Sequence, residues 1–194
     1  FIPPKCERFG FGWCSNTYNL NSISVSPLNS HFKCIDDKFV VGKSDQSIEI
    51  FDTLVFACRN IKEFILPSYI KKIEPFALAN CSELNEFVCS ENSQLSSIGQ
   101  YAFSHSLVSK IQIPKNVKEL EEGWFSSTEK LNEIEVSPEN NRFCYYNDQL
   151  LLFKSNPDFD FYDILCFAKR NIKQVIIPSN IRKISSHSFC QCKE

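Results

Sequence analysis

The feature that most constrains this chain is an internal repeat with an offset of 111 residues. The segment Leu20–Pro27 reads LNSISVSP and returns as LNEIEVSP at Leu131–Pro138. The match continues without a gap through FACRNIK and FAKRNIK, and on to Cys81 and Cys192. Roughly 27 of the 64 aligned positions are identical, which chance does not produce. We therefore expect the two parts of the chain to adopt the same local structure.

A shorter period lies inside the long one. The pattern Leu/Ile/Val-x-x-Ile/Phe/Val-x-apolar begins at Leu20, Ile61, Leu84, Val108, Leu131 and Ile172. Alternate residues of an extended strand point to opposite sides, so the pattern predicts short strands with one buried side. The steps are about 23 or 24 residues, with two of about 41, and units of about 20–29 residues are typical of solenoids. No single unit can bury its own apolar side, so its stability must come from stacking on its neighbours.

Each unit has a second half. A bulky pair follows the predicted strand, as in Ala77-Leu78, Ala102-Phe103 and Trp124-Phe125, and a Cys, Ser or Thr comes three residues later. Trp13-Cys14 holds the same position near the start of the chain. We expect these pairs to lie in short helical turns and to fill the side of the coil opposite the strands.

The combined pattern resembles the BspA-like leucine-rich repeats. It is carried by Val108-x-x-Ile111-x-Ile113-Pro114-x-x-Val117-x-x-Leu120, followed by Trp124-Phe125-x-x-Thr128. The match extends from about Phe9 to Cys192, and its departures change only the size of residues in one buried layer. The resemblance implies a β-rich leucine-rich-repeat solenoid over residues 1–194 with about six units. The absence of methionine predicts that the chain is part of a longer or processed protein.

The two long steps contain insertions of equivalent sequence, at about 32–51 and 143–162. Each has strand-like runs, such as Phe39-Val40-Val41 and Leu150-Leu151-Leu152, separated by turn-like residues. We expect a β-hairpin or a small three-stranded flap in each. A flap with a free strand edge must either pack on the solenoid or meet a partner.

Several classes of function find no support in the sequence. The net charge of −2 lacks the basic excess of a nucleic-acid-binding protein, and no apolar run is long enough to cross a membrane. His31, His105 and His187 have no catalytic or ligand partners at the usual spacing, and no cofactor motif occurs. Asp158 and Asp160 would share a strand face that could hold calcium, although a solvated edge strand explains them better. We expect no enzyme activity, no cofactor and no metal, and the pairing of the ten cysteines stays open.

Binding in a solenoid takes place on its surface, chiefly on the concave sheet. Strand alternation predicts which side chains point outward there. They are Glu63, Ile65, Glu86, Val88, Lys110, Gln112, Glu133, Glu135, Gln174 and Ile176. Ile65 and Val88 are apolar where solubility favours polar residues, and they lie on adjacent repeats, so we expect a protein partner to bind around them.

The resemblance also implies a location and a partner class. BspA-like repeats occur in surface and secreted proteins, for which adhesion to host cell-surface or matrix proteins is the usual inference. We therefore expect recognition of a protein at the cell surface, as in an adhesin or antigen. The alternative is a cytoplasmic scaffold or signalling adaptor, a compartment that fits the many thiols equally well. A carbohydrate-binding module is disfavoured because Trp13 and Trp124 are expected to be buried.

Overall fold

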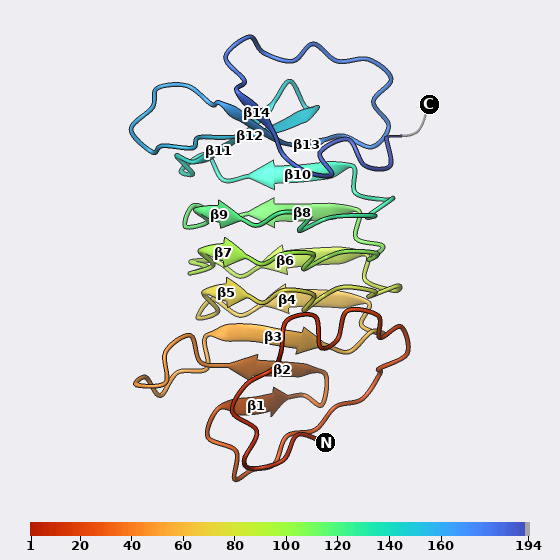
Figure 1. Ribbon diagram of the computed structural model, residues 1–194, viewed down its shortest axis with the longest axis vertical. Helices are drawn as coiled ribbons and strands as arrows, with labels where there is room; N and C mark the ends of the chain where they lie inside the picture. Colours follow the sequence, from red (N-terminus) through yellow and green to blue (C-terminus); the bar gives the residue numbers. More distant parts are fainter. Residues whose placement is uncertain (193–194) are drawn as a thin grey trace.

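The computed structural model describes residues 1–192, which form three sheets and, within that range, no helix. The strands are β1 (Phe32–Ile35), β2 (Phe39–Gly42), β3 (Thr53–Ala57), β4 (Glu63–Leu66), β5 (Lys72–Ile73), β6 (Glu86–Cys89), β7 (Ser97–Ile98), β8 (Lys110–Ile113), β9 (Glu119–Leu120), β10 (Glu133–Val136), β11 (Phe143–Tyr146), β12 (Leu150–Phe153), β13 (Ile164–Ala168) and β14 (Lys183–Ile184). Figure 1 shows successive turns of the coil stacked along its long axis. The repeat solenoid expected from the sequence is confirmed.

Two sheets run along the stack. The first strands of four consecutive units form a parallel sheet in the order β10-β8-β6-β4. The short second strands β5, β7 and β9 join β1, β2 and β3 in a six-stranded sheet, and β11 to β14 form a third sheet. Every repeat-to-repeat pair is parallel because the chain makes one complete turn before it returns to the same sheet.

The apolar positions of the repeat stack inside the coil. Leu84, Val108 and Leu131, the first residues of three successive units, have no exposed surface. The rings of Phe64 and Phe87, on neighbouring strands, have centroids 5.8 Å apart. This contact between equivalent residues is how each unit buries the side that it cannot bury alone.

The bulky pairs lie inside the coil, but not in the helical turns that we expected. Ala77, Leu78, Ala102 and Phe103 have no exposed surface. Residues with a positive φ lie four apart and enclose three of these pairs: Phe76 and Asn80, Tyr101 and His105, and Gly123 and Ser127. A right-handed helix cannot continue through left-handed residues, so these segments are successive tight turns. The helical part of the prediction is wrong for this reason.

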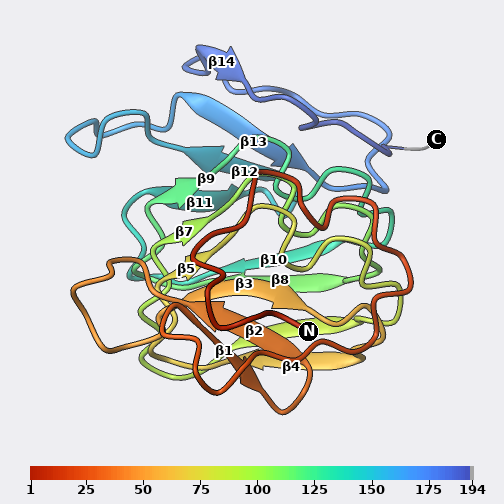
Figure 2. The same ribbon diagram turned by 60° about the horizontal axis from the view of Figure 1, so that its bottom comes forward.

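Each insertion is a three-stranded antiparallel meander, so the three-stranded alternative is confirmed. In β1-β2-β3 and in β11-β12-β13 the third strand begins after the predicted ends at 51 and 162. The hairpin turns carry positive φ at both central residues, Asp36 and Asp37 in one and Asn147 and Asp148 in the other. The third strands β3 and β13 pair with β5 and β14, so the insertions are continuous with the solenoid rather than separate flaps. The loops after β2 and β12 project from the same side of the molecule (Figures 1 and 2).

The insertions interrupt the first sheet. The expected first strand after Leu20 forms only an isolated bridge between Val25 and Ile2, and residues 174–177 form no strand. The ring of Phe39, at the start of β2, lies 4.4 Å from that of Phe64 and so occupies the interior beside β4. The hairpin therefore separates the first unit from β4, and the parallel sheet begins at β4 instead.

Buried polar residues repeat with the same offset as the strands. The Nδ2 group of Asn29 donates to the carbonyls of Pro3 and Cys6, and its Oδ1 accepts from the N–H groups of His31 and Phe32. Asn140 makes the four equivalent bonds, to Pro114, Val117, Arg142 and Phe143. The structural repeat therefore extends back to Pro3, well before Leu20. Each asparagine fixes the chain just before the first strand of an insertion, β1 or β11.

Two buried arginines occupy equivalent places beneath the third strands. The Arg59 guanidinium donates to the carbonyls of Thr17, Ala77 and Cys14 and packs over the ring of Phe56. The Cζ atom of Arg170 lies 4.9 Å from the ring centroid of Phe125 and 4.6 Å from that of Phe167. Carbonyl oxygens and aromatic faces, rather than carboxylates, surround these two cations.

Candidate functional site

The outward face of the β4-β6-β8-β10 sheet carries two rows of side chains. Register pairs Glu63 with Glu86, Glu86 with Lys110, and Lys110 with Glu133, which makes one row across the strands. Ile65, Val88, Gln112 and Glu135 make the second row. The residues between them, such as Phe87 and Ile111, are buried. The structure therefore brings eight of the ten predicted residues together on one surface.

Gln174 and Ile176 do not belong to this surface, so their predicted placement is wrong. Residues 174–177 form no strand, and the β11-β12-β13 meander lies between them and β10 in the chain. Ile176 is 86% exposed, whereas a residue on a packed strand face would be partly covered by its neighbours. The insertion displaces this segment in the same way that the first insertion displaces residues 22–25.

Half of the face, on β8 and β10, is an internally paired polar network. The Lys110 Nζ lies 2.8 Å from Glu133 Oε1 and 3.2 Å from Glu135 Oε2. Hydrogen bonds to these two carboxylates raise the pKa of Lys110, and bonds from Gln112 and Lys110 lower the pKa of Glu135. These charges already have partners, which leaves little for an incoming ligand to satisfy.

The other half, on β4 and β6, has different chemistry. Ile65 is 67% exposed and stands beside Val88, while the carboxylates of Glu63 and Glu86 stand beside each other in the next row. Like charges directly opposite each other across a sheet are destabilising. The transfer of exposed aliphatic surface from water into an interface is favourable. A partner that bound to the β4 and β6 half of the face would therefore bury apolar surface and supply countercharge to the glutamates.

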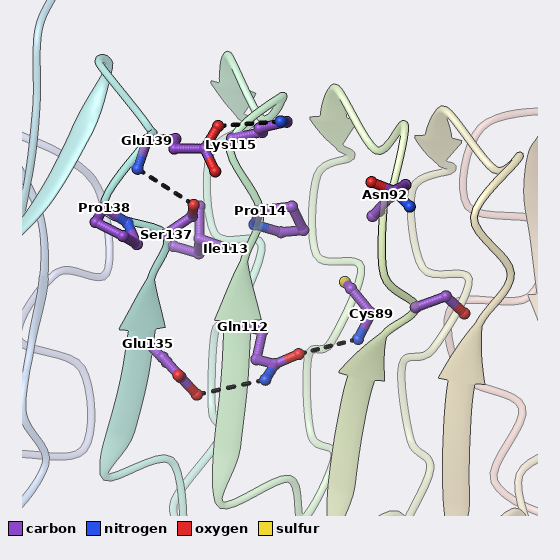
Figure 3. Close-up of a pocket in the computed structure, with 12 residues that line it drawn as sticks. Cys89, Asn92, Gln112, Ile113, Pro114, Lys115, Glu135, Ser137, Pro138 and Glu139 are labelled. Atoms are coloured by element: carbon purple, nitrogen blue, oxygen red, sulfur yellow. Dashed lines mark hydrogen bonds and ion pairs between the residues drawn. The ribbon is translucent and has the colours of Figure 1, made fainter.

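A hollow of about 350 Å³ lies at the ends of β6, β8 and β10. The four-residue ladders β4-β6 and β8-β10 flank a β6-β8 ladder of only two pairs. The residue after β6 is Ser90 and the residue after β10 is Ser137, and the N–H of each donates to the preceding strand, at Leu66 and Ile113. The equivalent residue after β8 is Pro114, which has no N–H to donate. The strands separate there, and the Gln112 side chain bridges the N–H of Cys89 and the carboxylate of Glu135 (Figure 3).

One of the residues that line this hollow, Cys89, carries a partly buried thiol. Burial raises the pKa of Cys89 to about 12, so the thiol stays protonated at neutral pH. Burial likewise raises the pKa of Cys81 to about 11 and that of Cys166 to about 12. All ten cysteines, which lie within residues 1–192, are free.

A second hollow, of about 750 Å³, lies between β4 and the hairpin turn of the first insertion. Its walls include Asp36, Lys38 and Phe39 from the hairpin, and Glu63 and Ile65 from β4. A counterpart of about 530 Å³ lies between the second hairpin turn and Gln174, where no strand forms. The first hollow therefore opens directly beside the apolar part of the sheet face.

The strand face that we expected to carry Asp158 and Asp160 does not form, so the solvated edge strand favoured for them is wrong. Asp158 and Asp160 lie in the irregular loop between β12 and β13, where Phe159 and Phe161 stack on each other beneath Arg182. Among residues 1–192, no group of three or more His, Cys, Asp and Glu side chains is arranged to hold a metal. Nor does any helix there have the length and apolarity to span a membrane.

Trp13 departs from the expectation that both tryptophans are buried. Trp124 is 2% exposed, but Trp13 is only partly buried and lines a hollow of about 400 Å³ near the start of the chain. Its ring stacks on Phe9 at 4.2 Å and touches Phe56 at 5.5 Å. Neighbouring rings therefore cover part of Trp13, and the rest of its surface lines the hollow.

Comparison with known proteins agrees with the repeat geometry. The BspA type leucine rich repeat region matches residues 49–150 and 162–194, in six copies, which is more than half of the chain. The chain is a BspA-type leucine-rich-repeat protein. No curated protein sequence matches it.

Solved structures resemble this BspA-type chain in fold. The pneumococcal vaccine antigen PcpA superimposes with a TM-score of 0.61 and 24% identity over 67% of this chain and 31% of its own. A leucine-rich repeat protein from Eubacterium ventriosum gives a TM-score of 0.53 and 23% identity over 68% of this chain and 39% of its own. The BspA-type chain thus spans about a third of the length of the structures that it resembles.

Proposed function

We propose that this chain is a non-enzymatic protein-recognition module that binds its partner through the outward face of β4 and β6. The observation that carries the proposal is the exposed Ile65 beside the partly buried Val88 on the adjacent strand, next to the carboxylates of Glu63 and Glu86, which have no ion-pair partner among residues 1–192. Rigid sheets position such residues well, because their backbone is fixed by the ladders on which they lie. The family supports a binding scaffold, since repeat solenoids present extended surfaces.

The proposed setting is the surface of a cell or a secreted protein, with a host cell-surface or matrix protein as the partner. Support comes from PcpA, which is described as a vaccine antigen and shares the fold. The adhesin role belongs to this proposal and rests on that likeness together with the exposed face.

Binding of the labelled chain to intact epithelial cells and to immobilised matrix proteins tests the proposal. The variant Ile65→Asp/Val88→Asp should lose saturable binding while its thermal unfolding stays nearly unchanged, because both side chains point outward. Ile176→Asp is the matched control, since Ile176 is the repeat counterpart of Ile65 but lies outside the sheet. Equal binding by the double variant and the natural chain would show that this face is not the site.

The second candidate function is an intracellular scaffold, and one observation favours it. All ten cysteines are free, and thiols are kept reduced in the cytosol. Titration of the native purified protein, and of the denatured protein as a reference, counts accessible and total thiols. Ten free thiols after isolation without reductant would favour the scaffold, and several disulfides would favour secretion.

A further inference from the structure

β4 is the last strand of its sheet, and its outer edge is free. Among residues 1–192 no strand pairs with β4 except β6. The carbonyl of Leu66 accepts from the N–H of Ser90, so the backbone groups of Leu66 and, two residues earlier, of Phe64 face β6. Alternation directs the N–H and C=O groups of Glu63 and Ile65 to the opposite edge, where no strand meets them.

Space for another strand exists beside this edge. The hollow of about 750 Å³ lies between β4 and the hairpin turn, and Glu63, Phe64 and Ile65 all line it. A neighbouring strand needs roughly 4.8 Å from β4 in the hydrogen-bonding direction. The volume of this hollow is large enough for a short extended segment beside β4, next to the ring of Phe39.

The edge has only some of the devices that prevent pairing, namely a short strand, the charge of Glu63 and the proline that follows the strand, Pro67. Proteins commonly protect edge strands with proline, inward-pointing charge, lysine or a bulge. Within β4 itself there is no lysine, no inward-pointing charge and no bulge, and its outward Ile65 is exposed. The nearest lysine, Lys62, precedes the strand and lies 3.7 Å from Glu83.

The repeat supplies an internal comparison. The counterpart hollow borders Gln174, but residues 174–177 form no strand and offer no regular row of donors and acceptors. At the other end of the same sheet, β10 packs beside β11. Among the described residues, the combination of a free strand edge and an adjacent hollow therefore occurs at β4.

We propose that an extended segment of a partner protein binds by adding a strand to the free edge of β4. Its backbone would pair with the N–H and C=O groups of Glu63 and Ile65, a recognised mode of peptide binding. This inference rests on the proposed function and specifies how the same region recognises its partner.

The side chains beside the edge define the segment's chemistry. Residues two apart in the added strand lie beside Glu63 and Ile65 on the outward face, because these are also two apart. A Lys or Arg beside Glu63 supplies the missing countercharge, and an aliphatic residue beside Ile65 extends the apolar row. The residue between them points toward the partly exposed ring of Phe39 and should be apolar. The expected motif is basic, apolar, aliphatic.

The test uses the full chain and a fluorescent peptide, acetyl-Thr-Lys-Val-Ile-Thr-amide, with two backbone-methylated forms. One form carries N-methyl groups on Lys and Ile, and the other on Val, so each blocks one edge of the peptide strand. We expect one methylated form to bind as the parent does and the other to lose at least about tenfold in affinity. Equal binding by both forms, equal loss by both, or no binding of the parent peptide would overturn strand addition.

Hydrogen exchange of the backbone amides of β4 supplies a second measurement, and it can be made with the peptide or with any other partner. In the free chain the amides of Glu63 and Ile65 should exchange faster than those of Phe64 and Leu66. The peptide should slow the exchange of the Glu63 and Ile65 amides by about tenfold or more, and Ile65→Asp should weaken this effect while Ile176→Asp does not.

Two results in the free chain would contradict this mode. Protection of the Ile65 amide at every protein concentration would contradict a free edge, and protection that grows with concentration would identify a second copy as the occupant instead. Loss of cell binding in Ile65→Asp/Val88→Asp without any slowing by ligand would preserve the proposed function and reject this mode.

Discussion

The Oε1 atom of Gln112 accepts a hydrogen bond from the backbone N–H of Cys89 at 3.2 Å, in the place where a strand backbone would otherwise pair. Its Nε2 atom donates to Glu135 at 3.3 Å. One side chain thus joins β6 to β10 across the point where Pro114 ends the β6-β8 ladder (Figure 3). The sheet divides there into an apolar half on β4 and β6 and a charge-paired half on β8 and β10.

Gln112→Ala should destabilise the chain by about 1 kcal/mol, because it removes a hydrogen bond to a partly buried N–H and leaves that donor unpaired. Urea unfolding followed by circular dichroism measures the change. Gln174→Ala is the matched control, since Gln174 is exposed and outside the sheet, and should change stability by less than about 0.5 kcal/mol. Equal effects of the two variants would mean that the bridge contributes nothing.

Asn140→Ala should cost more, roughly 2–4 kcal/mol, because it leaves two carbonyls and two N–H groups without their partner in a buried place. The neighbouring exposed Asn141→Ala serves as the control and should be nearly neutral. The same unfolding experiment measures both variants. A small loss for Asn140→Ala would show that water replaces the side chain without penalty.

Leu131→Ala tests the ladder of repeats. Leu131 has no exposed surface and begins the unit whose first strand is β10. Removal of its side chain opens a cavity that the stacked neighbours cannot close, so the expected loss is roughly 2–5 kcal/mol. Ile176→Ala, at an exposed position, supplies the comparison. If Leu131→Ala unfolds at the same urea concentration as the natural chain, the stacking argument fails for this unit.

Periodicity predicted the interior of this protein well because each inward position is set by the alternation of one strand. Phe64, Phe87 and Ile111 are buried between outward neighbours as the pattern requires. Periodicity could not predict that the insertions separate whole units, because the pattern Ile172-x-x-Val175 is the same whether or not a neighbouring strand is present. Gln174 and Ile176 were misplaced for that reason.

The buried polar residues could have been predicted from the sequence but were not. Asn29 and Asn140, Arg59 and Arg170, and Asp52 and Asp163 are identical pairs across the 111-residue offset. Polar identity in an otherwise apolar repeat indicates a buried hydrogen-bonding role, and each of these side chains is buried. The left-handed turns were harder to predict, because Phe76 and Tyr101 are not residue types that favour positive φ.

Asp52 and Asp163 make acid stability predictable in direction. Burial raises the pKa of the Asp52 carboxyl, but hydrogen bonds from the N–H and hydroxyl of Ser44 and from Lys71 outweigh it, so the pKa lies below its ordinary value of 3.8. Ser155 holds Asp163 in the same way, and its pKa is also lowered.

A carboxyl with a depressed folded-state pKa contributes stability above its unfolded pKa and loses it as the pH falls. Because Asp52 stays ionised well above its ordinary pKa, its contribution to the melting temperature should be constant between about pH 5 and pH 7. The melting temperature should fall below about pH 4, where the carboxyl begins to take up a proton. Asp52→Asn should lower stability by roughly 1–3 kcal/mol at pH 7, because a charge-assisted hydrogen-bond set is lost, and should flatten the decline below pH 4. Melting curves from pH 2 to 7 measure both effects, with the loop variant Asp158→Asn as the control. A decline of unchanged slope in Asp52→Asn would show that other carboxyls govern the acid response.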